Sequence, residues 1–192
     1  MEAFLVSLTS VATAEIGDRT QLLALVLAAR FRRPWPIAAG VLCATIANHA
    51  LAGWIGSLIG RQLIPARLDL LVGISMIVMA LWTLKPDKLD ADREKVTDTG
   101  AFVATLIAFF VAEIGDKTQI ATVALAAAYA NLVAVVAGTT CGMLAANIPV
   151  IFLGNAFAHR LPLKAIHYAA ASLFVVIGIV FVFRSGVFGH HP

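Results

Sequence analysis

The chain has 192 residues, of which 60% are hydrophobic and 13% charged, and its mean hydropathy is +0.91. A soluble domain is roughly 45–50% apolar and about 25% charged, so this chain has more apolar surface than a soluble fold of its length can bury. The composition excludes an ordinary soluble domain and predicts an all-α integral membrane protein in a lipid bilayer. The formal charge of +3 therefore gives no reason to expect a nucleic-acid partner.

Six apolar stretches are long enough to cross a membrane, which takes about 20 mostly apolar residues per helix. Transmembrane helices are expected over residues 3–29, 35–60, 66–84, 101–128, 131–158 and 164–184. Basic residues and proline, such as Arg32, Arg33 and Pro34, separate consecutive stretches. The first stretch is preceded by Glu2 rather than by basic residues, so we interpret it as a membrane helix and not as a cleaved signal.

Residues 85–100 differ from the rest of the chain because acidic and basic side chains are mixed there at high density. Such a segment cannot enter lipid, and its composition is typical of a flexible linker. It divides the chain into a first three-helix repeat, residues 1–84, and a second three-helix repeat, residues 101–192.

One heptapeptide occurs in both halves. Residues 15–21 read Glu-Ile-Gly-Asp-Arg-Thr-Gln, and residues 113–119 read Glu-Ile-Gly-Asp-Lys-Thr-Gln. The same offset of 98 residues aligns further identical pairs, namely Phe4 with Phe102, Gly40 with Gly138, Cys43 with Cys141, Gly56 with Gly154 and Leu63 with Leu161. The matches indicate an internal duplication. Because three helices is an odd number, the second repeat enters the membrane from the opposite side, which predicts two inverted-topology repeats.

The distribution of lysine and arginine predicts the orientation in the membrane. Nine of these residues fall on the side of the linker, namely Arg30, Arg32, Arg33, Lys85, Lys88, Arg93, Lys95, Arg160 and Lys164. Three fall on the other side, namely Arg61, Arg67 and Arg184. The linker is therefore expected in the cytoplasm and both termini outside.

The repeated heptapeptides place four carboxylates in apolar stretches. In a continuous helix, residues three apart share a face, so Glu15 lies beside Asp18, and Glu113 beside Asp116. The intervening glycine allows close helix packing or a local break that frees backbone carbonyls. If the two repeats face each other, the four acids form an oxygen-rich cage suited to a hard or intermediate divalent cation. Polar residues expected to support the metal or a proton pathway are Thr20, Gln21, Thr118, Gln119, Asn48, His49 and Asn147.

Arg19 and Lys117 are candidate charge partners of these acids. An Asp, Lys or Arg at a helix centre costs about 2.5–3.5 kcal/mol, so six unpaired charges would cost on the order of 15–20 kcal/mol. Even with both bases paired, two negative charges remain, which favours a cation site over a purely structural role. Clustered acids in a low-dielectric region also favour bound protons. Exchange of a divalent cation for protons follows as a hypothesis.

The doubled Glu-x-Gly-Asp-(Lys/Arg)-Thr motif, together with six helices and a charged central linker, resembles the family of Golgi calcium/manganese–proton exchangers and their bacterial manganese exporter relatives. The resemblance implies that the chain exports Mn²⁺ or Ca²⁺ in exchange for protons. It also implies that Glu15, Asp18, Glu113 and Asp116 bind the ion. The chain is close to the minimal core of the family, which favours a multi-pass protein of the bacterial inner membrane.

Manganese export is the preferred function, with a Ca²⁺/H⁺ antiporter as the alternative within the class. The sequence leaves open an exporter of small cationic metabolites and, less favoured, a membrane-embedded metal-dependent enzyme. An enzyme would need a nucleophile or an activated water, and a symmetrical acidic site offers no obvious one. No prosthetic group is expected, since the metal is the transported substrate. Self-association into a homo-oligomer is left open.

Overall fold

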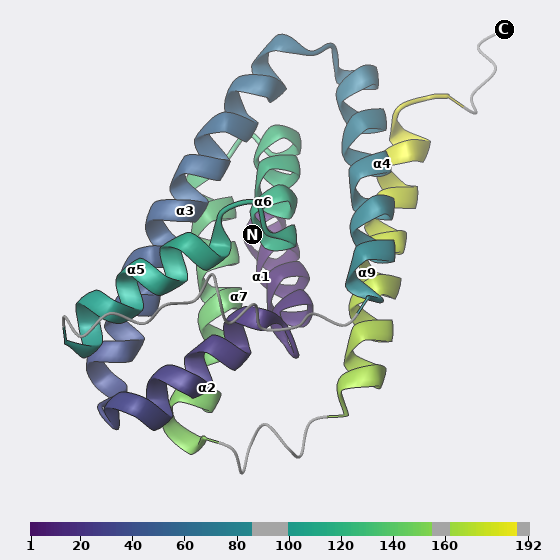
Figure 1. The fold of residues 1–192 in the computed structure, drawn as a ribbon. Helices are drawn as coiled ribbons and strands as arrows, with labels where there is room; N and C mark the ends of the chain where they lie inside the picture. The colour runs from purple at the N-terminus through teal and green to yellow at the C-terminus, as the bar shows by residue number, and fades with distance from the viewer. Residues whose placement is uncertain (86–99, 155–161, 188–192) are drawn as a thin grey trace, which may run out of the picture.

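The structure is a computed structural model that describes residues 1–85, 100–154 and 162–187, and over these residues it contains helices and no strand. Figure 1 shows the helices α1 (Glu2–Glu15), α2 (Arg19–Phe31), α3 (Pro34–Gln62), α4 (Pro65–Thr83), α5 (Ala101–Glu113), α6 (Lys117–Ala128), α7 (Leu132–Leu153) and α9 (Leu163–Arg184). The expected all-helical class is confirmed. Residues 86–99 of the predicted linker, and residues 155–158 of the predicted fifth helix, lie outside the described residues.

Among the described residues, four helices are long and apolar enough to cross a membrane, namely α3, α4, α7 and α9. At 1.5 Å per residue, the 29 residues of α3 extend over about 44 Å, more than the roughly 30 Å of a bilayer's hydrocarbon core. Large apolar side chains such as Leu81 and Val176 are exposed on these helices, as a lipid-facing surface requires. α5 is apolar but shorter, with 13 residues.

The first and fourth predicted helices are each broken in two, so the expectation of continuous helices over 3–29 and 101–128 was wrong. α1 ends at Glu15 and α2 begins at Arg19, while α5 ends at Glu113 and α6 begins at Lys117. Gly17 has φ +84° and Gly115 has φ +75°, a conformation that side chains other than glycine rarely adopt. The glycine between the acids therefore turns the chain out of the helix, and only the alternative of a local break is borne out.

The aspartate of each motif starts the next helix. Asp18 is the N-cap of α2, and its carboxylate accepts a hydrogen bond from the Thr20 backbone N–H at 3.3 Å. Asp116 caps α6 in the same way, accepting from the Thr118 N–H at 3.4 Å. Aspartate is a preferred N-cap because its oxygen satisfies a backbone donor that has no partner within the helix. The break in each motif thus fixes the position of the aspartate carboxylate at the start of the following helix.

Helices of one half pack mainly against helices of the other half. α7 lies along α1, and α3 lies along α5 and α6. Glycines permit both close approaches: a Cβ at Gly138 would collide with the Phe4 carbonyl oxygen of α1, and a Cβ at Gly40 would lie 2.9 Å from the Phe102 carbonyl oxygen of α5. The two contacts correspond at the 98-residue offset, so the same packing occurs twice.

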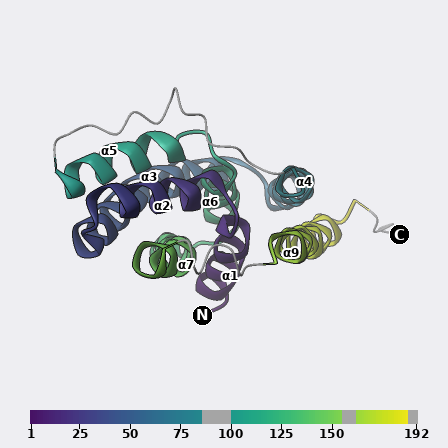
Figure 2. The ribbon, with the colours of Figure 1, turned by 60° about the horizontal axis from the view of Figure 1, so that its bottom comes forward.

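α4 and α9 form a pair at one side of the other helices, as both Figure 1 and Figure 2 show. They run in opposite directions in Figure 1, and so do α3 and α7. Within the described residues, α4 also packs against α6 and α9 against α1, whereas neither packs closely against α2 or α5. The α4–α9 pair therefore packs against α1 and α6 rather than against α2 and α5.

Candidate cation-binding site

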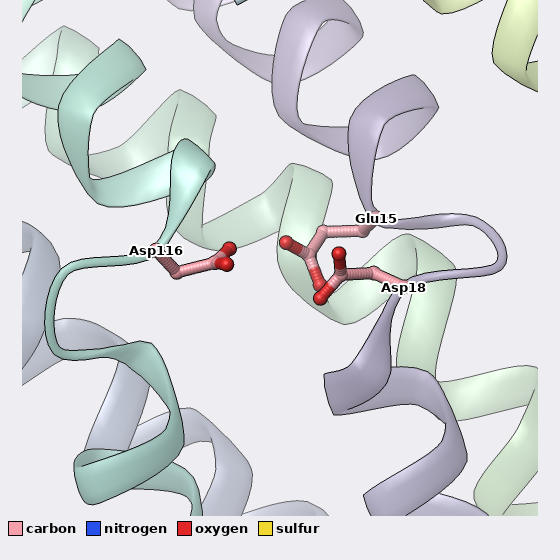
Figure 3. A group of neighbouring side chains, drawn as sticks. All are labelled: Glu15, Asp18 and Asp116. Atoms are coloured by element: carbon pink, nitrogen blue, oxygen red, sulfur yellow. The ribbon is translucent and has the colours of Figure 1, made fainter. Parts of the chain in front are cut away.

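The two helix breaks meet in the interior of the protein and bring acids from both motifs together. Figure 3 shows Glu15 and Asp18 of the first motif facing Asp116 of the second. One carboxylate oxygen from each of the three lies within 4.8 Å of the others. Glu15 and Asp18 have no exposed surface, and Asp116 is 3% exposed. The charged groups therefore lie in the buried interior, where an unpaired carboxylate is costly.

Glu113, the fourth acid of the two motifs, is fully buried beside this group. Its carboxylate is close enough to Glu15, Asp18 and Asp116 to be repelled by each of them. One carboxylate oxygen of Glu15 and one of Glu113 have no hydrogen-bond partner among the described residues. The sequence-predicted acids thus converge, with three of them close enough to share one ion and Glu113 adjoining them.

The hydroxyl of each motif's threonine lies within hydrogen-bond distance of both the glutamate and the aspartate of the same motif. The Thr20 hydroxyl is 2.5 Å from a Glu15 oxygen and 3.3 Å from an Asp18 oxygen. The Thr118 hydroxyl lies 3.3 Å from both Glu113 and Asp116. A hydroxyl has one proton to donate, so each threonine can bond to only one of its two carboxylates at a time.

The basic residue of each motif pairs with the aspartate of the other motif. The Lys117 ammonium pairs with Asp18 in the interior, where the lysine side chain is 2% exposed. The Arg19 guanidinium lies 3.2 Å from an Asp116 oxygen and also donates to the Ala112 carbonyl at 2.6 Å. These crossed ion pairs tie the two halves together at the site and leave the two glutamates as the less compensated acids.

The glutamines stabilise the helix breaks. The Gln21 amide oxygen accepts a hydrogen bond from the Gly17 N–H at 2.9 Å, and the Gln119 oxygen accepts from the Gly115 N–H at 2.8 Å. Gln21 also donates to the Ala146 carbonyl of α7 at 3.0 Å. Their amide oxygens thus satisfy backbone donors that the break exposes, and the expected support of the ion stays a prediction.

Three polar residues of α3 and α7 were expected near the pathway, and all three are buried. Asn48 donates to the Phe110 carbonyl at 3.1 Å, and Asn147 donates to the Met143 carbonyl at 3.1 Å. The His49 Nε2 atom lies 4.0 Å from a Glu113 oxygen. Sequence reasoning selected His49 from its position in an apolar helix but gave no indication of this neighbour. It also missed the backbone carbonyls of Ala112 and Ala146, which carry no side-chain signal.

Buried acids at breaks in two related helices, inside an apolar helical protein, are characteristic of membrane cation transporters. The chain belongs to the family described as "Divalent cation/proton antiporter GDT1", which matches residues 3–91 and 101–186. Proteins of this family are transporters and not enzymes, and the divalent cation is their substrate rather than a resident cofactor. The expected family, the expected class of activity and the membrane character are thereby confirmed.

Relatives of the chain occur in bacteria and plants. It is 49% identical over 184 residues to a Vibrio cholerae protein named "Putative manganese exporter", with 95% of this chain and 92% of that protein covered. It is 29% identical over 203 residues to "GDT1-like protein sll0615" of Synechocystis, with coverage of 94% and 96%. "Protein PAM71, chloroplastic" of Arabidopsis thaliana is 29% identical over 202 residues, with coverage of 88% and 53%. No solved structure matches the chain significantly.

Proposed function

We propose that this protein exports Mn²⁺ from the bacterial cytoplasm in exchange for protons, and that one site formed by both motifs binds the ion. The observation that carries this proposal is the group of Glu15, Asp18 and Asp116 oxygens within 4.8 Å of one another in the buried interior. Membership of the antiporter family and the name of the Vibrio cholerae relative support the choice of ion.

The ion is held by Glu15, Asp18, Glu113 and Asp116, with the threonine hydroxyls beside them. Carboxylate and hydroxyl oxygens are the ligands that Mn²⁺ and Ca²⁺ prefer. Since Lys117 and Arg19 already pair with the two aspartates, the two glutamates provide the charge that the ion neutralises. In the absence of the ion the same glutamates hold protons, because two ionised carboxylates close together in a buried site repel each other.

Coupling to protons is needed to move the ion outward. Export of a divalent cation against a potential of about 100 mV, negative inside, costs about 4.6 kcal/mol. Through a passive pore, the membrane potential would therefore drive the ion into the cell rather than out of it. Alternate occupation of one set of carboxylates by the ion and by protons links their two fluxes.

The architecture behind this exchange is a pair of inverted repeats, residues 1–84 and 101–192, joined by a cytoplasmic linker at 85–100. Support comes from the opposite directions of α3 and α7 and from the matching contacts of Gly40 and Gly138 in the two halves. Inverted repeats let a transporter adopt two related arrangements around one central site. α1–α2 and α5–α6 then act as the two broken transmembrane helices, which restores six crossings.

We attribute alternating access to the α4–α9 pair. It packs against α1 and α6 here, and the repeat relation maps these two helices onto α5 and α2. Packing of the same pair against α5 and α2 would expose the site to the other side of the membrane. From the lysine and arginine distribution we infer that the linker lies in the cytoplasm and both termini outside. Membership of the transporter family and the bacterial relative support a location in the inner membrane.

Reconstitution into proteoliposomes tests the proposed function. Vesicles contain a pH indicator, and Mn²⁺ or Ca²⁺ is added outside. Entry of Mn²⁺ should be accompanied by a rise of internal pH as protons leave, and Glu15→Gln and Glu113→Gln should abolish both signals. Mn²⁺ entry without a change in pH would refute antiport, and uptake of Ca²⁺ but not Mn²⁺ would assign the alternative ion. Normal transport by the glutamine variants would refute the site.

Orientation has a separate test, because it rests on the distribution of charge alone. A single cysteine introduced into the linker at residues 85–100 should be protected from an impermeant thiol reagent in intact cells and labelled after the membrane is opened. Labelling in intact cells would reverse the proposed topology.

A further inference from the structure

His49 is a buried polar residue beside the site, and no hydrogen bond within the described residues explains its position. The side chain has no exposed surface, and neither ring nitrogen has a hydrogen-bond partner among the described residues. A buried imidazole without partners is costly, and in native proteins such a group is explained by strain, by a functional role or by a bound water or ion. Asn147, at the equivalent position of the second half, differs because its amide donates to the Met143 carbonyl.

The neighbour of His49 is an acid of the site. Its Nε2 atom lies 4.0 Å from the Glu113 Oε2 atom, which is too far for a hydrogen bond. First-row divalent ions such as Zn²⁺ hold imidazole nitrogen and carboxylate oxygen at roughly 2.0–2.2 Å, so two ligands of one ion lie about 3.0–4.3 Å apart. The observed separation falls within that range. This separation allows His49 and Glu113 to bind one ion that lies between them.

We propose that His49 is a ligand of the transported ion and that it makes the site selective for first-row transition ions over alkaline-earth ions. This inference rests on the proposed function of the site and adds to it the origin of its preference between Mn²⁺ and Ca²⁺. Calcium in proteins takes oxygen ligands. Mn²⁺ shares the preference for carboxylate oxygens, but it is a first-row transition ion, and ions of that series also bind imidazole nitrogen. A single nitrogen among carboxylates therefore disfavours Ca²⁺ without requiring a smaller site.

The proposed preference for transition ions over Ca²⁺ comes from a residue in one half of the protein only. Asn147 of α7 offers an amide in place of the imidazole, so the internal duplication does not supply a second nitrogen ligand. Substitution of His49 by asparagine makes the two halves alike at this position. The variant His49→Asn thus removes the nitrogen and keeps a polar side chain that the fold already accommodates at the equivalent place.

The test is pulsed electron paramagnetic resonance of Mn²⁺ bound to the full-length protein labelled with ¹⁵N-histidine. Bound Mn²⁺ should show the coupling of a directly ligated imidazole nitrogen. His49→Asn should lose that coupling, while the control His167→Asn, in a half-buried histidine of α9, should keep it. Mn²⁺ binding to the wild type without a ¹⁵N coupling, or a coupling that survives in His49→Asn, would overturn the proposal.

Affinities provide a second readout that a merely structural role would not change selectively. Mutation of a residue that supports a metal ligand lowers metal affinity by roughly 10–100-fold. Removal of the ligand itself in His49→Asn should lower the affinity for Mn²⁺ by at least as much, with little change in the affinity for Ca²⁺. An equal loss for both ions in His49→Asn and in His49→Gln would refute selectivity. If the wild type transports Ca²⁺ and binds no Mn²⁺, the proposed function itself fails; Mn²⁺ transport without a nitrogen coupling refutes this inference alone.

Discussion

Each motif supplies the counter-charge for the aspartate of the other motif. The two crossed pairs are not equivalent, because the Lys117 side chain is 2% exposed and that of Arg19 is 28% exposed. Removing one partner of a buried ion pair leaves an uncompensated charge and costs about 3–5 kcal/mol, whereas exposed pairs contribute about 0–1 kcal/mol. The buried pair should therefore matter more for stability.

We predict that Lys117→Met lowers the thermal stability of the protein in detergent more than Arg19→Met does. Addition of Asp18→Asn to Lys117→Met should restore part of the loss, since asparagine is neutral and still caps α2. Thermal unfolding followed by tryptophan fluorescence measures both effects. A double variant no more stable than Lys117→Met would show that the pair does not stabilise the fold as described.

At this scale the sequence predicted the acids, and Arg19 and Lys117 as their charge partners, but not which base pairs with which acid. A carboxylate in an apolar stretch is visible in the sequence because its burial is costly, and the second copy of the motif strengthened that prediction. Which cation pairs with Asp18 depends on the distance between two motifs that lie far apart in the chain. The pairing with Lys117, and the neighbourhood of His49 and Glu113, therefore required the structure.

At the scale of the elements, the helix breaks were the main difference from expectation. An isolated glycine is tolerated inside a helix, so an apolar run through Gly17 or Gly115 is compatible with a continuous helix. What favours the break is the combination of a positive φ at glycine, the aspartate cap and the glutamine that binds the glycine N–H. In the sequence this combination is visible only as a glycine, an aspartate and a glutamine, and none of these residues alone specifies a break.

The close contact between α3 and α5 gives an element-scale prediction. A Cβ at Gly40 would lie 2.8 Å from the Thr105 Cβ atom and 2.9 Å from a backbone oxygen, so Gly40→Val must push the two helices apart. Overpacking typically costs about 1–3 kcal/mol. Ala39→Val is the matched control, because Ala39 is exposed on the same helix. Equal unfolding temperatures for the two variants would contradict the described packing.

At the scale of the whole molecule, the α4–α9 pair lies asymmetrically on an otherwise repetitive arrangement. At one end, the rings of Tyr129 and Phe181 meet edge to face with centroids 6.3 Å apart, and the Tyr129 hydroxyl contacts Glu2 at 3.1 Å. This contact joins α9 to the ends of α6 and α1. In the alternating-access proposal, transport requires it to open.

A short bifunctional thiol reagent should therefore lock the protein when cysteines replace Tyr129 and Phe181 in a cysteine-free background. We expect transport to stop after cross-linking, because the pair can no longer move to α5 and α2. Treatment with a monofunctional reagent of similar size is the control. Undiminished transport by the cross-linked protein would exclude a motion of α9 relative to α6.

The central claim is that two motifs, far apart in the chain, form one cation site. The number of Mn²⁺ ions bound per chain, measured by equilibrium binding to the purified protein, tests it most directly. We predict one ion per chain, and its loss in either single variant, Glu15→Gln or Glu113→Gln. Two ions per chain, with one ion lost in each variant, would show that each motif binds an ion by itself and would contradict the account.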